Sequence, residues 1–273
     1  MEEKRKHHRR RKRSMLSNII LVIALAVFAF SAYKLIDIYS EYHKGDKEYD
    51  NIVEDAIEVK TQKTEETEKE HEEQKPKVHV SLKVDFEKLK KANKDVVAWI
   101  QFDEPEKINY PVVKGEDNDK YLSTTFEGKK NSSGAIFMDV LNAGDFSDRN
   151  TFIYGHNMKN GSMFGQLRKF KTKEYYEQNP YFYIYTPDGK EVKYQIFAVC
   201  IVEDTSRSYT RFYNSDEEYL DYLNYVKSIA RYDTGVDLAA DSKIISLSTC
   251  TNVSETQRLL VHGVKISETV VGE

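Results

Sequence analysis

Cysteine, proline and glycine are scarce in this chain of 273 residues, which contains two, five and twelve of them. Two cysteines cannot build the set of disulfide bridges that stabilises very small secreted folds. Without a histidine cluster they also cannot complete a four-ligand structural zinc site. So little glycine and proline excludes a collagen-like chain, while an apolar content of 40% is enough for a globular core. The sequence therefore predicts a packed domain that is stabilised by buried apolar side chains.

Outside one short N-terminal segment, acidic side chains outnumber basic ones. Residues 1–14 contain eight Lys and Arg and two Glu, and the rest of the chain has 33 basic and 43 acidic side chains, a net charge of −10. Binding to nucleic acid requires a concentrated positive surface that neutralises phosphates. The body of the protein is therefore not expected to bind nucleic acid.

The basic segment is followed directly by a long uncharged one. Residues 15–33 contain no charged side chain, and 19 helical residues would span nearly 30 Å at about 1.5 Å per residue. The basic flank orients the N-terminus toward the cytoplasm. We therefore predict a cytoplasmic tail (residues 1–14), a single transmembrane anchor (residues 15–36) and an extracytoplasmic remainder. A cleaved signal peptide, with small residues such as Ala29 and Ser31 near the cleavage site, is the alternative.

Residues 37–81 have the composition of a charged linker or stalk. Residues 61–75 are almost entirely polar and have nothing to bury. An earlier group, Tyr49, Ile52 and Ala56, has the spacing of an amphipathic helix that packs on the domain. The globular domain is expected to occupy residues 82–273.

The domain sequence predicts a mainly β fold. Segments rich in β-branched and aromatic residues are bounded by turn residues, and we expect strands at 108–113, 135–138, 151–154, 181–185, 192–202, 243–248 and 258–266. A helical stripe of apolar residues runs through residues 85–102. A second, longer helix is expected after Ser215, which forms an N-terminal capping box with Glu218.

Only two of the seven histidines, His156 and His262, belong to the predicted domain. His156 follows the strand at 151–154 and lies in a turn between Gly155 and Asn157, so its imidazole is expected at a strand end. His262 is in the middle of a strand. We therefore interpret His156 as a candidate catalytic group and His262 as a structural residue.

Cys250 is the candidate nucleophile of the chain. It ends a predicted strand and enters a polar loop, whereas Cys200 lies in an apolar run that is typical of a buried strand. These separate settings do not favour a disulfide between the two. A thiol is only slightly ionised at neutral pH and needs a neighbouring histidine or cation. His156 could supply the first, and Arg258, at the start of the next strand, could stabilise an oxyanion.

Several ordered motifs resemble those of the sortases, and in particular class B. The resemblance covers residues 82–266 and includes LSTC, which ends at Cys250, the downstream Arg258, and YGHNMKNGSMFGQL, which begins at Tyr154. DVVAWI, NYPVVKG, KYLSTTF and GAIFMD also match, as does a long helix before the cysteine strand. The family usually has Thr at the first position of its TLxTC motif; here Ser246 keeps the hydroxyl group.

The resemblance implies a closed β-barrel of seven to eight strands with N-terminal helices and one long helix before the cysteine strand. It implies a membrane-anchored cysteine transpeptidase without metal or cofactor, which cleaves a C-terminal sorting signal of secreted proteins after Thr. A thioacyl intermediate on Cys250 would be resolved by an amine of a lipid-linked cell-wall precursor, with His156 as general acid and Arg258 as oxyanion donor. By similarity, the signal groove would be lined by Leu122, Ser248, Thr251, Tyr209 and Phe212.

Other functions use some of the same residues. A papain-like hydrolase has the cysteine before the histidine in the chain, which does not fit His156 before Cys250. A cysteine peptidase that only hydrolyses, and a catalytically idle, membrane-anchored binding module, remain as alternatives. A thiol-reactive probe distinguishes the idle module from an enzyme.

Overall fold

The computed structural model describes residues 2–59, 79–251 and 253–271, and the chain divides into two compact units, one up to Lys44 and one from Gly45 onward. Helix α1 (Glu2–Ala56) contributes its residues up to Lys44 to the first unit and its residues from Gly45 onward to the second. From Asn18 this helix is long and apolar enough to cross a membrane, and its apolar side chains, such as Phe28, are exposed. A membrane anchor and a signal sequence both have these properties.

The second unit contains a closed barrel of eight strands, paired in both antiparallel and parallel fashion, in the order β10–β8–β7–β3–β4–β5–β6–β9. The mainly β barrel predicted from the sequence is therefore confirmed, and each of the seven predicted strands is present. The barrel strands are β3 (Val96–Gln101), β4 (Asn109–Val113), β5 (Ile136–Met138), β6 (Asn150–Tyr154), β7 (Tyr181–Thr186), β8 (Lys190–Glu203), β9 (Ile244–Cys250) and β10 (Gln257–Val270).

The helix predicted over residues 85–102 is wrong in its second half. Helix α2 (Phe86–Ala92) starts at the N-cap Asp85, whose side chain accepts a hydrogen bond from the Lys88 amide, and Asn93 ends it in an extended conformation. Val96 then begins strand β3. β-branched residues favour extended backbone, and pairing with β4 and β7 buries this strand inside the sheet. Tertiary pairing thus decides a segment in which the apolar spacing is ambiguous.

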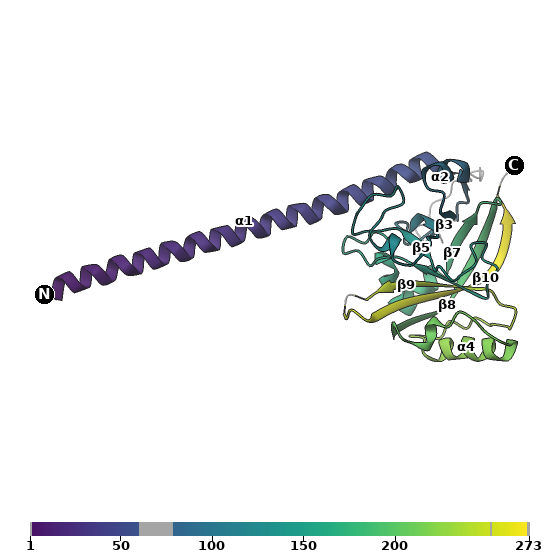
Figure 1. The fold of residues 1–273 in the computed structure, drawn as a ribbon. Helices are drawn as coiled ribbons and strands as arrows, with labels where there is room; N and C mark the ends of the chain where they lie inside the picture. The colour runs from purple at the N-terminus through teal and green to yellow at the C-terminus, as the bar shows by residue number, and fades with distance from the viewer. Residues whose placement is uncertain (1, 60–78, 252, 272–273) are drawn as a thin grey trace, which may run out of the picture. The chain divides into compact units, whose positions relative to one another are not determined.

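The predicted long helix is α4 (Asp216–Ser228), and its capping box is present. Ser215 Oγ accepts a hydrogen bond from the Glu218 amide (3.1 Å). The buried face of α4 packs on residues of β8, β9 and β10, outside the barrel (Figure 1). Shorter elements complete the unit: the two-stranded sheet of β1 (Ile57–Val59) and β2 (Leu82–Val84), helix α3 (Lys173–Gln178), and the 3₁₀ turns η1 (Lys120–Leu122), η2 (Gly165–Lys171) and η3 (Arg207–Tyr209).

The end of α1 is part of the second unit, although it falls within the predicted linker. Tyr49, Ile52 and Ala56 are buried, as their helical spacing suggested. The Tyr49 hydroxyl donates to the carbonyl of Gly134 (2.7 Å) and accepts from the amide of Phe126 (3.2 Å). This helix end therefore holds the loop between β4 and β5 at two points. The other part of the linker, residues 60–78, lies outside the described residues.

Candidate active site

Strands β6 and β9 bring His156 and Cys250 to the same edge of the barrel. The two strands pair in parallel, with Tyr154 opposite Ser248, and the Gly155 amide donates to the Ser248 carbonyl (3.2 Å). His156 follows Tyr154 by two residues, and Cys250 follows Ser248 by two. Because parallel strands end at the same edge, this register brings His156 and Cys250 to one edge of the barrel although they are far apart in sequence.

Arg258 reaches this edge from the neighbouring strand. In the antiparallel β9–β10 ladder Arg258 lies directly opposite Cys250, and opposite residues of such a ladder project from the same face. The Arg258 guanidinium donates to the carbonyl of Glu255 (2.6 Å) and lies 3.5 Å from a carboxylate oxygen of Asp204. These contacts fix the side chain at the rim, where a cation can face developing negative charge.

Two hydrogen bonds position His156 and Asn157, which are adjacent in the loop after β6. His156 Nε2 lies 2.7 Å from the carbonyl oxygen of Leu122, and because a carbonyl only accepts, Nε2 carries the proton of this bond. Asn157 Nδ2 donates to the carbonyl oxygen of Cys250 (2.7 Å). The first bond leaves Nδ1 available for a proton, and the second ties the histidine loop to the cysteine residue itself.

The three residues surround one cavity of about 290 Å³. Its lining consists of Asn118, Asp119, Leu122, Phe137, Tyr154, Gly155, His156, Ser248, Thr249, Cys250 and Arg258. A side chain at Gly155 would collide with Ile136 and Phe164, because a Cβ there would lie 2.4 Å from Ile136 Cδ1. Glycine is therefore required just before His156 for the strand end to pack closely on the barrel.

The five residues expected to line the signal groove have different positions. Leu122 and Ser248 line the cavity. Tyr209 lies behind Ser248, with its hydroxyl 2.8 Å from Ser248 Oγ. Thr251 is buried and its hydroxyl donates to Gln257 Oε1 (3.0 Å) within the β9–β10 hairpin, whereas Phe212 is 65% exposed and lies outside the cavity lining.

The second cysteine and the second histidine are buried away from the solvent. Burial raises the pKa of Cys200 to about 12, and its thiol lies 3.6 Å from the Val226 carbonyl; both cysteines are free thiols. His262 is fully buried, and burial lowers its pKa to about 3. The hydroxyl of Ser246 donates to Asn150 Oδ1 (2.8 Å) and lies 2.8 Å from His262 Nδ1, from which it accepts. A hydroxyl at position 246 therefore holds a buried polar network beneath the site.

Sequence reasoning missed a second polar group near the cavity. Asp139 follows β5, is fully buried, and accepts hydrogen bonds from Arg211 and from the hydroxyl of Tyr154. Burial alone would raise the pKa of Asp139. Hydrogen bonds from Tyr154, the Leu141 amide and Arg211 outweigh that effect and lower it. The only sequence signal was the position of an Asp directly after a short apolar strand.

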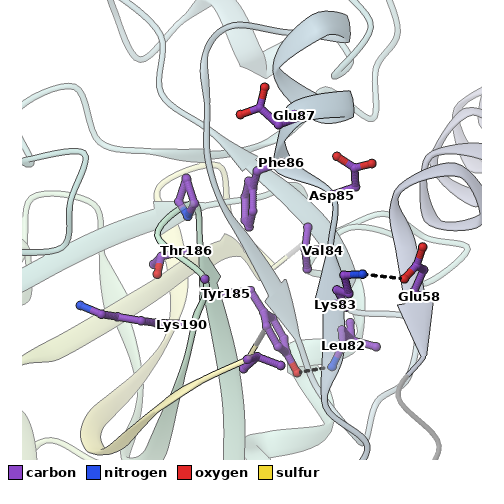
Figure 2. A pocket seen from close by; sticks show the side chains of 13 residues that line it. Glu58, Leu82, Lys83, Val84, Asp85, Phe86, Glu87, Tyr185, Thr186 and Lys190 are labelled. Atoms are coloured by element: carbon purple, nitrogen blue, oxygen red, sulfur yellow. Dashed lines mark hydrogen bonds and ion pairs between the residues drawn. The ribbon is translucent and has the colours of Figure 1, made fainter. Parts of the chain in front are cut away.

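Two larger cavities of the second unit do not have the groups needed for this chemistry. One, of about 310 Å³, lies between β2, the start of α2 and the β7–β8 turn; there Lys83 pairs with Glu58 (3.1 Å) and the Tyr185 hydroxyl accepts from the Leu82 amide (3.2 Å) (Figure 2). The other, of about 590 Å³, is lined by apolar side chains together with lysines and carboxylates, among them Lys190, Asp188 and Glu268. Neither lining contains a thiol or an imidazole. Within the described part of the chain, no group of three His, Cys, Asp or Glu side chains could hold a metal ion.

Comparison with known proteins places the chain in a family. The Sortase domain model matches residues 103–266. The chain is 32% identical to sortase B of Listeria monocytogenes over 92% of this chain and 97% of that protein, and 30% identical to sortase B of Staphylococcus aureus over 91% and 94%. A crystal structure of sortase B from B. anthracis matches with a TM-score of 0.68 at 30% identity, over 84% of this chain and all of that chain. The chain therefore belongs to the sortase family of cysteine transpeptidases, and within that family it is a class B sortase.

Proposed function

We propose that this sortase cleaves a C-terminal sorting signal after Thr and transfers the resulting acyl group to an amine of a cell-wall precursor. The observation that carries the proposal is the arrangement of Cys250, His156 and Arg258 around one cavity, two of them at adjacent ends of the parallel strands β6 and β9. Solved relatives include a Staphylococcus aureus sortase B–substrate complex and a sortase B complexed with triglycine, which supports a peptide donor and an amine acceptor.

Each residue has a distinct role in the proposed reaction. The Cys250 thiolate attacks the carbonyl carbon of Thr, and the carbonyl oxygen takes the negative charge, which Arg258 stabilises. His156 donates a proton to the leaving amine as the C–N bond breaks, and a thioester remains on Cys250. The amine of the acceptor then attacks this thioester, loses a proton to His156, and releases Cys250 as the thiolate. The products are the joined peptide and the free C-terminal fragment.

The test uses the full-length protein in detergent and a library of synthetic peptides, each with a single Thr. Triglycine is the acceptor, and mass spectrometry identifies the products. We expect cleavage after Thr and a product lengthened by triglycine, both lost in Cys250→Ala. Cleavage to a free acid only, even at high triglycine, would identify a peptidase that only hydrolyses. No cleavage together with no labelling of Cys250 by iodoacetamide would favour the idle binding module.

The membrane anchor belongs to the same proposal. The eight basic residues before an uncharged segment, and an exposed apolar helix in that segment, support an N-terminus in the cytoplasm and an extracytoplasmic domain. Protease added to intact spheroplasts should then digest the domain and leave a short N-terminal fragment. Protection of the domain would contradict this topology, and N-terminal sequencing of the mature protein would reveal a cleaved signal peptide.

A further inference from the structure

A buried ion pair links two segments beside the catalytic cavity. Asp139 follows β5, and Arg211 lies in residues 204–215, which connect β8 to α4. Arg211 Nε and Nη2 lie 2.9 and 2.6 Å from the same carboxylate oxygen of Asp139. The Asp139 side chain is fully buried, and 23% of the Arg211 side chain is exposed. A carboxylate buried in this way needs its cation, since removing one partner leaves an uncompensated charge in the interior.

The ion pair extends directly to the cavity lining. The Tyr154 hydroxyl donates to Asp139 (2.7 Å) and accepts from Arg211 Nη2 (2.9 Å). Arg211 Nη1 donates to the backbone carbonyl of Tyr209 (3.1 Å), and the hydroxyl of Tyr209 contacts Ser248 Oγ. Tyr154 and Ser248 both line the cavity. The Arg211 guanidinium therefore fixes Tyr154 directly and supports Ser248 through Tyr209.

Aromatic stacking adds to this arrangement. The Arg211 guanidinium lies over the Phe152 ring, 5.1 Å from its centre, and the ring of Tyr209 stacks on Phe152 at 5.5 Å. Phe152 belongs to β6, the strand that leads to His156. The connecting segment is thus held against β6 by charge, hydrogen bonds and stacking at the same point.

We propose that Asp139 and Arg211 are positioning residues that hold residues 204–215 against strand β6. In this way they fix the part of the cavity lining, formed by Tyr154 and Ser248, that receives the sorting signal. The inference rests on the proposed function. Neither side chain is required to touch the reacting atoms. Loss of the pair should therefore weaken binding of the peptide and leave the reactivity of the thiol intact.

The experiment compares Asp139→Asn and Arg211→Gln with the parent in the full-length protein in detergent. The probe is the synthetic peptide that the parent cleaves best. We expect KM to rise by about tenfold to a hundredfold, the effect of losing a hydrogen bond to a charged group, while kcat changes by less than about threefold. Alkylation of Cys250 by iodoacetamide, corrected with Cys250→Ala, should keep its rate. Arg211→Lys retains the charge but loses the two-pronged geometry, so its KM should be intermediate.

Arg207→Gln is the matched control. Arg207 lies in the same segment, pairs with Asp221 and stacks on Tyr225, but it does not contact Asp139 or the cavity lining, and its KM should equal that of the parent. The proposal would be overturned if Asp139→Asn and Arg211→Gln kept the KM of the parent or lowered only kcat. It would also be overturned if the alkylation rate of Cys250 fell together with peptide binding, or if Arg207→Gln raised KM as much as the other two variants. If Asp139→Asn does not melt cooperatively, the KM of Arg211→Gln tests the proposal instead. If neither variant folds, the ion pair is needed for folding, and the proposal is overturned. If the parent itself cleaves no peptide, the proposed function fails first.

Discussion

The side chain of Asn157 donates a hydrogen bond to the backbone carbonyl of Cys250, its neighbour across the β6–β9 edge. Since Asn157 is adjacent to His156 in the chain, this single bond fixes the loop of the imidazole relative to the backbone of the thiol. The His156 loop and Cys250 are thus held together by a side-chain to main-chain hydrogen bond, which requires no contact between the imidazole and the thiol.

Asn157→Ala should lower kcat/KM for peptide cleavage by about threefold to tenfold, because one neutral hydrogen bond contributes about 0.5–1.5 kcal/mol. Steady-state kinetics with the full-length protein provide the measurement. Lys159→Ala, an exposed position in the same loop, should have the activity of the parent. Equal activity of Asn157→Ala and the parent would show that the bond does not position the site.

The two cysteines should differ in reactivity. Cys250 is partly exposed at the cavity, whereas Cys200 is fully buried and its pKa is raised to about 12. Cys250→Ala should abolish both cleavage and labelling by iodoacetamide in the folded protein. Cys200→Ala should retain both, with a stability loss of roughly 1 kcal/mol from the missing buried atom. Comparable labelling of the two cysteines in the parent would contradict this contrast.

Arg258→Lys should slow acylation by about a hundredfold or more, since loss of one oxyanion donor costs about 2.7–4 kcal/mol in the transition state. Lysine keeps the charge but not the planar set of donors. Single-turnover thioester formation, followed by mass spectrometry, measures the effect. Arg231→Lys, at a position outside the cavity lining, is the matched control. A rate within fivefold of the parent would indicate that Arg258 makes only a surface ion pair with Asp204.

The free energy of unfolding should depend on pH through His79, which lies just before β2. The His79 ring stacks on Tyr183 at 3.5 Å, with Nδ1 2.7 Å from Asp103 and Nε2 3.3 Å from Glu191. Burial lowers the pKa of His79, but hydrogen bonds to the two carboxylates outweigh this and raise it to about 9. The folded state thus binds this proton more tightly than the unfolded state, in which an ordinary histidine titrates near 6.5.

The stabilisation by His79 is therefore complete below about pH 6.5 and is lost as the pH rises through about 9, with a magnitude on the order of 3 kcal/mol. Urea unfolding of the full-length protein in detergent can follow the fluorescence of the buried Trp99. The difference in free energy of unfolding between the parent and His79→Gln should be constant at low pH and shrink toward pH 9.5. His43→Gln, at an exposed position, should show no such trend. A difference that grows with pH would contradict the assignment.

Tyr49→Phe should destabilise the protein although Tyr49 is remote in sequence from the site. Its hydroxyl bridges Phe126 and Gly134, in the same β4–β5 loop that contains Leu122, the acceptor of His156 Nε2. Loss of the hydroxyl leaves a buried amide and carbonyl unpaired, at a cost of about 1–3 kcal/mol. Urea unfolding measures this cost, and Tyr39→Phe, an exposed position on the same helix, serves as control. An unchanged free energy of unfolding would contradict the role of the hydroxyl.

Local patterns predicted those parts of the fold that depend on neighbouring residues. The seven strands follow from runs of β-branched and aromatic side chains, and α4 follows from its apolar spacing and the Ser215 cap. The apolar spacing around Val96 fits both a helix and a strand, and only pairing with β4 and β7 decides between them. The candidate site followed from residue types at strand ends together with the family motifs.

Long-range contacts could not be predicted in the same way. Asp139 and Arg211 are 72 residues apart, and nothing in the local sequence of either indicates the other. The orientation of Thr251, which turns into the hairpin toward Gln257, depends on the loop conformation. The packing of Tyr49 depends on the loop between β4 and β5, which contributes acceptor and donor from its own backbone.

The parallel pairing of β6 and β9 makes the distance between His156 and Cys250 independent of the length of chain that joins them. That chain includes β7, β8 and α4, yet the strand register alone sets where both residues emerge. The exposed turn at Gly189 between β7 and β8 could therefore receive an inserted reporter domain, or be opened so that two fragments assemble into one enzyme. By the same argument, an insertion at this turn would leave the register of β6 and β9, and with it the candidate site, unchanged.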